Sequence, residues 1–166
     1  AIAAGCTSII KPAALTPLTT LYFAKLLEDA GLPKGVVNVL TTSTSRAISD
    51  PIIADPRLRK LSVTGSTGVG QQLMKQASEG VLRTSMELGG NAPFVVFEDA
   101  DLDGAIEGVV DAIWFNQGQV CCAGSRLLVQ EGVAPKLYEK LRARMEKLRV
   151  GDPLDKNTDV GAINSR

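Results

Sequence analysis

The amino-acid sequence predicts an α/β fold in which helices cover one or both faces of a parallel sheet. Short apolar runs typical of buried strands alternate with longer stretches of helical periodicity. Glycine and proline stand at the junctions between them. The 166 residues are 45% hydrophobic and 22% charged, which is the composition of a globular protein large enough to bury a core. Together these observations indicate strand–helix repeats, which favour parallel strands.

The first half of the chain contains three such repeats. The run CTSIIK at 6–11 predicts a strand, and Thr16 and Pro17 predict the N-cap and first turn of a helix that Gly31 ends. This alternation is typical of one half of a dinucleotide-binding architecture. The later repeats place strands at 36–40 and 61–64, and helices at 46–54 and from 66 until Gly80.

The second half begins with two strands on either side of a glycine turn. Residues 83–88 and 93–97 predict these strands, and ELGGNAP joins them. A helix with one apolar face then starts at Asp99 or Asp101 and ends at Gly118.

The last predicted elements are a strand at 125–130 and an amphipathic helix at 134–148. Lysine and arginine side chains of this helix point outward. Its predicted inward positions are Leu137, Leu141, Met145 and Leu148.

The composition argues against several classes of function. With 18 Lys and Arg against 18 Asp and Glu, the chain has no basic excess, so nucleic acid is a poor candidate partner. Three cysteines and no histidine cannot build a structural zinc site, and their odd number favours reduced thiols. No apolar run is long enough to span a membrane, and the start lacks a signal peptide. We therefore expect a soluble, cytoplasmic protein without a metal.

The stretch VTGSTGVG leads from a predicted strand into a predicted helix. Such a junction directs backbone N–H groups and the positive end of the helix dipole toward a phosphate. Its glycines, Gly65, Gly68 and Gly70, do not have the GxGxxG spacing of a dinucleotide fingerprint. A plain turn, with the glycines needed for tight packing and Ser66 as an N-cap, explains the stretch equally well.

Two adjacent thiols follow the third long helix, in the stretch FNQGQVCCAGSR. A cysteine nucleophile reacts as the thiolate, so it needs a lowered pKa or a nearby base, and without histidine that base is a carboxylate, a lysine or water. Cys121 lies in a loop of small residues with room for a substrate. Neighbouring residues in such a loop generally point in different directions, so one thiol is expected to face a cleft while the other packs inward. Alternatively, both are ordinary core cysteines.

Glu87 is the candidate base. The two glycines that follow it in MELGGN permit a sharp turn that directs a carboxylate out of a strand end. The alternative is that Glu87 is a solvated turn residue without a chemical role.

Taken together, these segments resemble the NAD(P)-dependent aldehyde dehydrogenase superfamily over essentially the whole chain. The resemblance rests on KPAALTPLTTLYFAKLLEDAGLPKGVVNVL, VTGST, MELGGNAPFVVFEDADLD and FNQGQVCCAGSR, in this order. It implies the second half of a Rossmann-like dinucleotide-binding domain within residues 1–85 and the start of the α/β catalytic domain within 86–166. The run after ELGG is most similar to succinate-semialdehyde-type members.

The resemblance assigns roles to individual positions. It implies that Cys121, in the GQxC pattern, is the nucleophile and that Glu87, in ELGG, is the general base. Lys11 matches the lysine that holds the adenosine ribose, and the main chain of Leu88 is expected near the nicotinamide. The remaining implied cofactor-binding positions are Pro12, Ala14, Gly65, Ser66 and Val69.

The implied reaction is oxidation of an aldehyde to a carboxylic acid with NAD or NADP, through a cysteine thiohemiacetal and a thioester. Glu87 favours hydrolysis of the thioester over its transfer to CoA, which is the alternative within this family. Ala14 stands where many NAD-preferring relatives have a glutamate, so NADP is tolerable. The substrate is expected to be a small or medium aldehyde, and the subunit a dimer or tetramer.

The family's oxyanion-hole asparagine and ribose-binding glutamate lie outside this chain. We therefore expect a fragment of a longer subunit, inactive when isolated, because losing one oxyanion donor costs about 100- to 1,000-fold in rate. The alternative is a fragment that keeps dinucleotide binding or a scaffolding role but not turnover.

Overall fold

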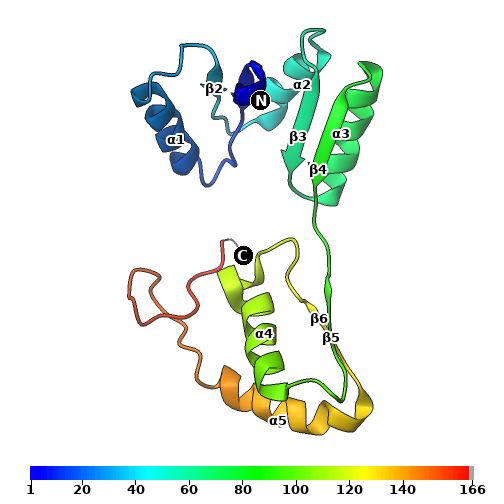
Figure 1. The fold of residues 1–166 in the computed structure, drawn as a ribbon. Helices are drawn as coiled ribbons and strands as arrows, with labels where there is room; N and C mark the ends of the chain where they lie inside the picture. The colour runs from blue at the N-terminus through cyan, green and yellow to red at the C-terminus, as the bar shows by residue number, and fades with distance from the viewer. Residues whose placement is uncertain (165–166) are drawn as a thin grey trace. The chain divides into compact units, whose positions relative to one another are not determined.

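The computed structural model describes residues 1–164 and contains the mixture of helices and strands that the sequence predicts (Figure 1). The α/β class is therefore confirmed. The chain forms two compact units, one made of Ala1–Leu61 and Met74–Thr84 and the other of Ser62–Leu73 and Ser85–Arg166. None of the helices in residues 1–164 combines the length and apolar character needed to cross a bilayer.

The first unit begins with a short 3₁₀ turn, η1 (Ile2–Ala4), and a strand–helix–strand repeat. Strand β1 (Ser8–Ile10) pairs in parallel with β2 (Val37–Val39), and α1 (Leu18–Asp29) makes the crossover between them. Helix α2 (Ser45–Ala54) follows β2. This order confirms the predicted parallel arrangement for the first repeat.

The predicted start of the first long helix is wrong by one residue. Pro17 already has helical dihedral angles and occupies the N-cap position of α1, where no side chain caps the helix. Thr16 instead belongs to the preceding turn, because its amide donates to the Ala13 carbonyl at 3.2 Å. Proline is tolerated at the start of a helix because its ring fixes φ near the helical value and because the N–H that it lacks would have no partner there. It does not cap the helix with its side chain.

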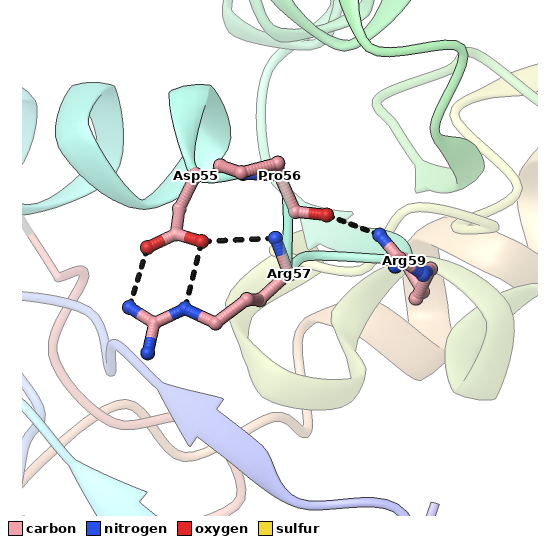
Figure 2. Close-up of polar contacts among 4 residues, drawn as sticks. All are labelled: Asp55, Pro56, Arg57 and Arg59. Atoms are coloured by element: carbon pink, nitrogen blue, oxygen red, sulfur yellow. Dashed lines mark hydrogen bonds and ion pairs between the residues drawn. The ribbon is translucent and has the colours of Figure 1, made fainter.

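A close pair of charges shapes the turn that leaves α2 (Figure 2). The Asp55 carboxylate accepts from Nε and Nη2 of Arg57 at 2.9 and 2.6 Å, and from the Arg57 amide at 2.9 Å. Arg59 donates to the Pro56 carbonyl in the same turn. The side-chain and backbone hydrogen bonds from Arg57 lower the pKa of Asp55 from 3.8 to about 2.

Strand β3 (Lys60–Thr64), helix α3 (Thr67–Glu79) and strand β4 (Arg83–Glu87) come next, and β3 pairs with β4. Strand β5 (Pro93–Val96) pairs in parallel with β6 (Arg126–Val129), with Pro93 opposite Arg126.

Helix α4 (Leu102–Trp114) connects β5 to β6 through the 3₁₀ turn η2 (Phe115–Gly118), and η3 (Glu131–Val133) leads into α5 (Ala134–Met145). Asp101 is the N-cap of α4 and accepts from the Asp103 amide at 3.1 Å, as one of the two predicted starts requires.

The core of the second unit lies between the β5–β6 pair and the helices α4 and α5. Val96, Ile106 and Leu137 are its buried centre, and Leu137 is completely buried. Arg144 of α5 pairs with Glu107 of α4 at 2.8 Å across the two helices. Partly buried side chains complete this core: Phe94, Ala100, Leu102, Ala105, Leu127, Val129 and Leu141.

Three further details differ from the sequence-based expectation. The described strands form three separate two-stranded sheets rather than one sheet, because the sequence order of strands does not determine which strands become neighbours. Helix α4 ends at Trp114 rather than Gly118, since Asn116 and Gln117 have left-handed dihedral angles. Met145, expected to face inward, is 41% exposed.

Candidate active site

Cys121 and Cys122 occupy the two central positions of a β-turn formed by Val120–Ala123, which we call the thiol turn. The Ala123 amide closes it by donating to the Val120 carbonyl at 3.0 Å. Both thiols are free and exposed. The expectation that one of the two thiols packs inward is therefore wrong, because a tight turn projects both of its central side chains outward. Exposure of Cys121 leaves its sulfur accessible to a substrate.

The backbone immediately before the thiol turn is strained. Asn116, Gln117 and Gly118 have φ values of 49°, 58° and 75°, so two residues with side chains adopt the left-handed region. The Asn116 side chain donates to the Gln119 carbonyl at 3.1 Å, and the Gln119 amide donates back to the Asn116 carbonyl at 3.0 Å. These reciprocal hydrogen bonds stabilise the strained conformation. Such strain is concentrated at functional sites.

The backbone immediately after the thiol turn packs against the core of the second unit. Ala123 is buried, and the Gly124 amide donates to the Ala112 carbonyl of α4 at 3.0 Å. A Cβ on Gly124 would approach Phe94 and Ala112 to within 3.3 Å and 3.2 Å, so a larger residue would require these neighbours to shift by a few tenths of an ångström. The thiol turn is thus anchored at both ends.

Glu87 is the last residue of β4 and its side chain is exposed. Its carbonyl accepts a hydrogen bond from the Gly65 amide at 3.0 Å, which joins it to the loop after β3. The chain then runs on through Leu88–Gly90 without a turn or a bend, so the turn that the sequence predicts here is wrong; we keep the name glycine turn for these three residues. A Cβ on Gly90 would lie 3.5 Å from the Cys121 carbonyl oxygen. The structure therefore brings the segment that carries Glu87 next to the thiol turn.

The glycine loop at 65–70 lies in the same unit as Glu87 and Cys121. Ser66 precedes α3, and its hydroxyl accepts from the Val69 amide at 3.4 Å, so a capping role is present. Gly65, Ser66 and Val69 are exposed, and no atom lies within 4 Å of a Cβ built on Gly68. This open helix N-terminus fits a phosphate group; the phosphate role remains a prediction.

Leu88 packs against the first turns of α3. A Cβ on Gly70 would approach Cδ2 of Leu88 to 2.7 Å, and Gly70 is buried. Glycine at position 70 therefore allows the Leu88 side chain to lie directly on the helix backbone, which positions the main chain that follows Glu87.

The other predicted cofactor residues, Lys11, Pro12 and Ala14, belong to the first unit. Lys11 is partly buried, and its ammonium donates to the Pro12 carbonyl at 2.8 Å. A groove of about 260 Å³ lies beside them, and no carboxylate lines it. Its lining residues are Pro12, Ala13, Ala14, Pro17, Thr41, Thr42 and Ser43.

Sequence reasoning missed three residues that join the two turns: Asn91, Ser125 and Arg126. The Ser125 hydroxyl donates to Asn91 Oδ1 at 3.3 Å, and Arg126 Nε donates to the Asn91 carbonyl at 2.8 Å. No periodicity or spacing signals such contacts, because the partners are 34 and 35 residues apart in the sequence. The sequence indicates these residues only by placing polar side chains directly after GG and directly after CCAG.

Residues 1–164 contain no cluster of three or more histidine, cysteine, aspartate or glutamate side chains that could hold a metal ion. The groups available at the site are two exposed thiols, one exposed carboxylate and an open helix N-terminus.

Comparison with known proteins places these features in a family. The profile of the aldehyde dehydrogenase family matches residues 1–166. The chain is 55% identical over 163 residues to a succinate-semialdehyde dehydrogenase of Paenarthrobacter nicotinovorans, covering 98% of this chain and 36% of that protein. It is 47% identical over 163 residues to an Escherichia coli succinate-semialdehyde dehydrogenase [NADP(+)], covering 98% of this chain and 34% of that protein.

The fold agrees with solved structures as well. The crystal structure of an NAD-dependent aldehyde dehydrogenase from Sinorhizobium meliloti superposes with a TM-score of 0.96 at 42% identity, covering 99% of this chain and 33% of that one. The chain thus spans about a third of the length of the relatives that it matches.

Proposed function

The chain belongs to the aldehyde dehydrogenase family, and on that premise we propose that it is the central part of a subunit that oxidises an aldehyde to a carboxylic acid with NAD or NADP. The observation that supports this most directly is the position of the glycine turn against the thiol turn, with Cys121 and Glu87 both exposed. Residues 1–85 would form part of the cofactor-binding domain and 86–166 part of the catalytic domain.

In this proposal the Cys121 thiolate adds to the aldehyde carbon and forms a thiohemiacetal. The backbone N–H of Cys121 donates to the oxyanion. A bound NAD or NADP supplies the acceptor for the hydride that leaves this carbon, which converts the thiohemiacetal into a thioester. Glu87 then takes a proton from a water molecule as its oxygen adds to the thioester carbon. The C–S bond breaks, the carboxylic acid leaves and the thiolate is regenerated.

The residues present fit the cofactor. The open N-terminus of α3, with Gly65 and Ser66 before it and Val69 in its first turn, would bind the phosphates. Lys11, Pro12 and Ala14 would bind the adenosine end, and the main chain at Leu88 would lie near the nicotinamide. The groove beside Ala14 contains no carboxylate to repel a 2′-phosphate, which agrees with an NADP-dependent relative as well as an NAD-dependent one.

The names of the relatives indicate a substrate class. Because succinate-semialdehyde dehydrogenases are 55% and 47% identical to this chain, we propose a small aldehyde that carries a carboxylate at its far end. The complete subunit would act as a dimer or tetramer, in the cytoplasm.

The thiol assignment is tested by Cys121→Ser and Cys122→Ser in the complete subunit. Cys121→Ser is expected to lower kcat by more than about 1,000-fold, as loss of a nucleophile does, while Cys122→Ser stays close to the wild type. Aldehyde-dependent formation of NADH or NADPH measures both. The reverse pattern would show that Cys122 is the nucleophile.

Glu87→Gln separates hydrolysis from CoA transfer. If Glu87 activates water, this variant accumulates the thioester on Cys121, so a burst of reduced cofactor precedes a slow steady state. If CoA is the natural acceptor, adding it accelerates the wild type and the variant equally, and the product is an acyl-CoA.

A further inference from the structure

The two glycines of the glycine turn cannot by themselves define where Glu87 lies. Gly89 and Gly90 are exposed, and no atom lies within 4 Å of a Cβ built on Gly89. Glycine has more backbone freedom than any other residue, so a turn of this kind needs contacts outside itself to hold one conformation. The neighbouring contacts therefore decide how precisely the Glu87 carboxylate meets the thiol turn.

On the Glu87 side these contacts are the Gly65–Glu87 hydrogen bond and the packing of Leu88 on α3. On the other side they come from the segment that follows the thiol turn. The Arg126 guanidinium donates through Nε to the Asn91 carbonyl at 2.8 Å, one residue after the glycine turn. The Ser125 hydroxyl donates to the Asn91 side chain at 3.3 Å, and the Arg126 amide donates to the Ala92 carbonyl at 3.3 Å. Asn91 is thus tied through both its main chain and its side chain to residues that begin three positions after Cys122.

We infer that Arg126, together with Asn91 and Ser125, is a positioning residue that sets the separation between Glu87 and Cys121. This inference rests on the proposed function. Arg126 donates to the main chain, so its bond constrains the path of the glycine turn, and a charged donor makes the stronger kind of hydrogen bond. The hydrogen bond from the Ser125 hydroxyl to the Asn91 side chain limits rotation of the main chain at Asn91.

The inference predicts which half of the reaction depends on Arg126. Acylation of Cys121 needs the thiol at the substrate carbonyl. Deacylation needs a water molecule held between the Glu87 carboxylate and the thioester, so it is sensitive to the distance between the two turns. Loosening the tie should slow deacylation much more than acylation.

An active ester distinguishes the two steps without the cofactor. With p-nitrophenyl acetate, the Cys121 thiolate attacks the ester carbonyl, the C–O bond breaks and p-nitrophenolate leaves, which gives an acetyl thioester. Water then adds while Glu87 takes its proton, the C–S bond breaks and acetate leaves. The burst of p-nitrophenolate reports acylation, and the steady state reports deacylation. Hydroxylamine attacks the thioester without needing Glu87.

The test uses Arg126→Met in the complete subunit, which keeps the side-chain length and removes the donor. The expected result is a full burst with a steady-state rate lowered about 10- to 100-fold, the size of effect that a misplacement of about 1 Å produces. Hydroxylamine restores the steady state to the wild-type rate measured with hydroxylamine, and Arg126→Lys, which keeps a cationic donor, recovers part of the loss. Arg142→Gln is the matched control, because Arg142 pairs with Glu146, the C-cap of α5.

An unchanged steady state in Arg126→Met overturns the inference, and so does a loss that hydroxylamine does not restore, since that loss reflects general damage. If Arg126→Met does not fold, Asn91→Ala and Ser125→Ala test the inference instead, because each removes only the hydrogen bond between the side chains of Ser125 and Asn91. A deacylation rate equal to that of the wild type in both variants would overturn the inference. The proposed function fails separately: a burst of p-nitrophenolate that survives in Cys121→Ser would remove Cys121 as nucleophile, whatever Arg126 does.

Discussion

Ala14 is the position at which the proposed function connects one side chain to the choice of cofactor. It lines a groove with Thr41, Thr42 and Ser43, and no acidic residue shares that lining. Ala14→Glu would place a carboxylate there, which repels the 2′-phosphate of NADP and can accept hydrogen bonds from the ribose hydroxyls of NAD. At about 1 kcal/mol for two unit charges 4 Å apart in water, the expected fall in kcat/KM for NADP is about fivefold relative to NAD.

Leu15→Glu is the control for this prediction, because it adds the same charge one residue away, at a side chain that is 72% exposed and does not line the groove. Equal losses for NAD and NADP in Ala14→Glu would mean that the groove does not receive the 2′ position.

At single residues, the sequence supports a prediction of chemistry but not of backbone conformation. Cys121 and Glu87 stand in motifs whose residue types restrict the chemistry, so they could be chosen before the fold was known. The left-handed angles of Asn116 and Gln117 could not, because glutamine has no preference for that region. Nor could the contact of Arg126 with Asn91, which depends on β5 pairing with β6 in one register.

Helix α3 contains two glycines, Gly68 and Gly70, that differ in how closely other side chains pack on them. Replacing each by alanine separates the effect of packing on stability from that of helix propensity. A Cβ on Gly68 meets no atom within 4 Å, whereas a Cβ on Gly70 meets Leu88 at 2.7 Å. Alanine is favoured over glycine in a helix by about 1 kcal/mol. We therefore expect Gly68→Ala to raise the free energy of unfolding, and Gly70→Ala to give no gain or a loss, because Leu88 must move.

Denaturant unfolding of the two variants measures this difference in stability. Each variant is the control for the other, because both replace a glycine of α3 by alanine. If Gly70→Ala were as stabilising as Gly68→Ala, Leu88 would not pack on α3 as described.

The turn after α2 makes a prediction about pH. The Arg57 hydrogen bonds lower the pKa of Asp55 to about 2, so the stabilisation from this pair is fully present above pH 3.8 and is lost as pH falls through about 2 (Figure 2). Arg57→Met should return the pKa of Asp55 toward 3.8. NMR titration of the Asp55 carboxyl carbon in the wild type and in Arg57→Met measures both values. An Asp55 pKa that is the same with and without Arg57 would contradict the prediction.

Among the elements, the sequence identified every long helix and every strand, and its errors lie at ends and in sheet order. Apolar periodicity is a property of ten or more residues, so α1, α3, α4 and α5 are evident from it. The start of α1 and the end of α4 depend on the dihedral angles of Pro17 and Asn116, which neighbouring packing determines. Strand neighbours depend on contacts between segments far apart in sequence.

For the whole molecule, the most informative feature is apolar surface on both sides of the β5–β6 pair. Phe94, Val96 and Leu127 pack into the core, yet Val95 and Leu128, opposite each other on the other face, are 50% and 52% exposed. Parallel strands are apolar on both sides when both faces of their sheet are covered. Since the chain spans about a third of its relatives, this face fits the proposal that the chain is part of a longer subunit.

The last prediction tests that proposal with Val95→Thr plus Leu128→Thr. Threonine has the β-branched shape that strands favour, and it puts a hydroxyl in place of a methyl of Val95 and of the isopropyl group of Leu128. In the complete subunit the face is expected to be buried, so the pair should lower the free energy of unfolding by about 2 to 4 kcal/mol. In residues 1–166 alone the face is exposed, so the same pair should reduce binding of a hydrophobic dye and leave stability nearly unchanged. Leu154→Thr is the control, because Leu154 is 90% exposed and lies outside any strand. Equal stability of the wild type and the double variant in the complete subunit would show that this face stays in contact with water there.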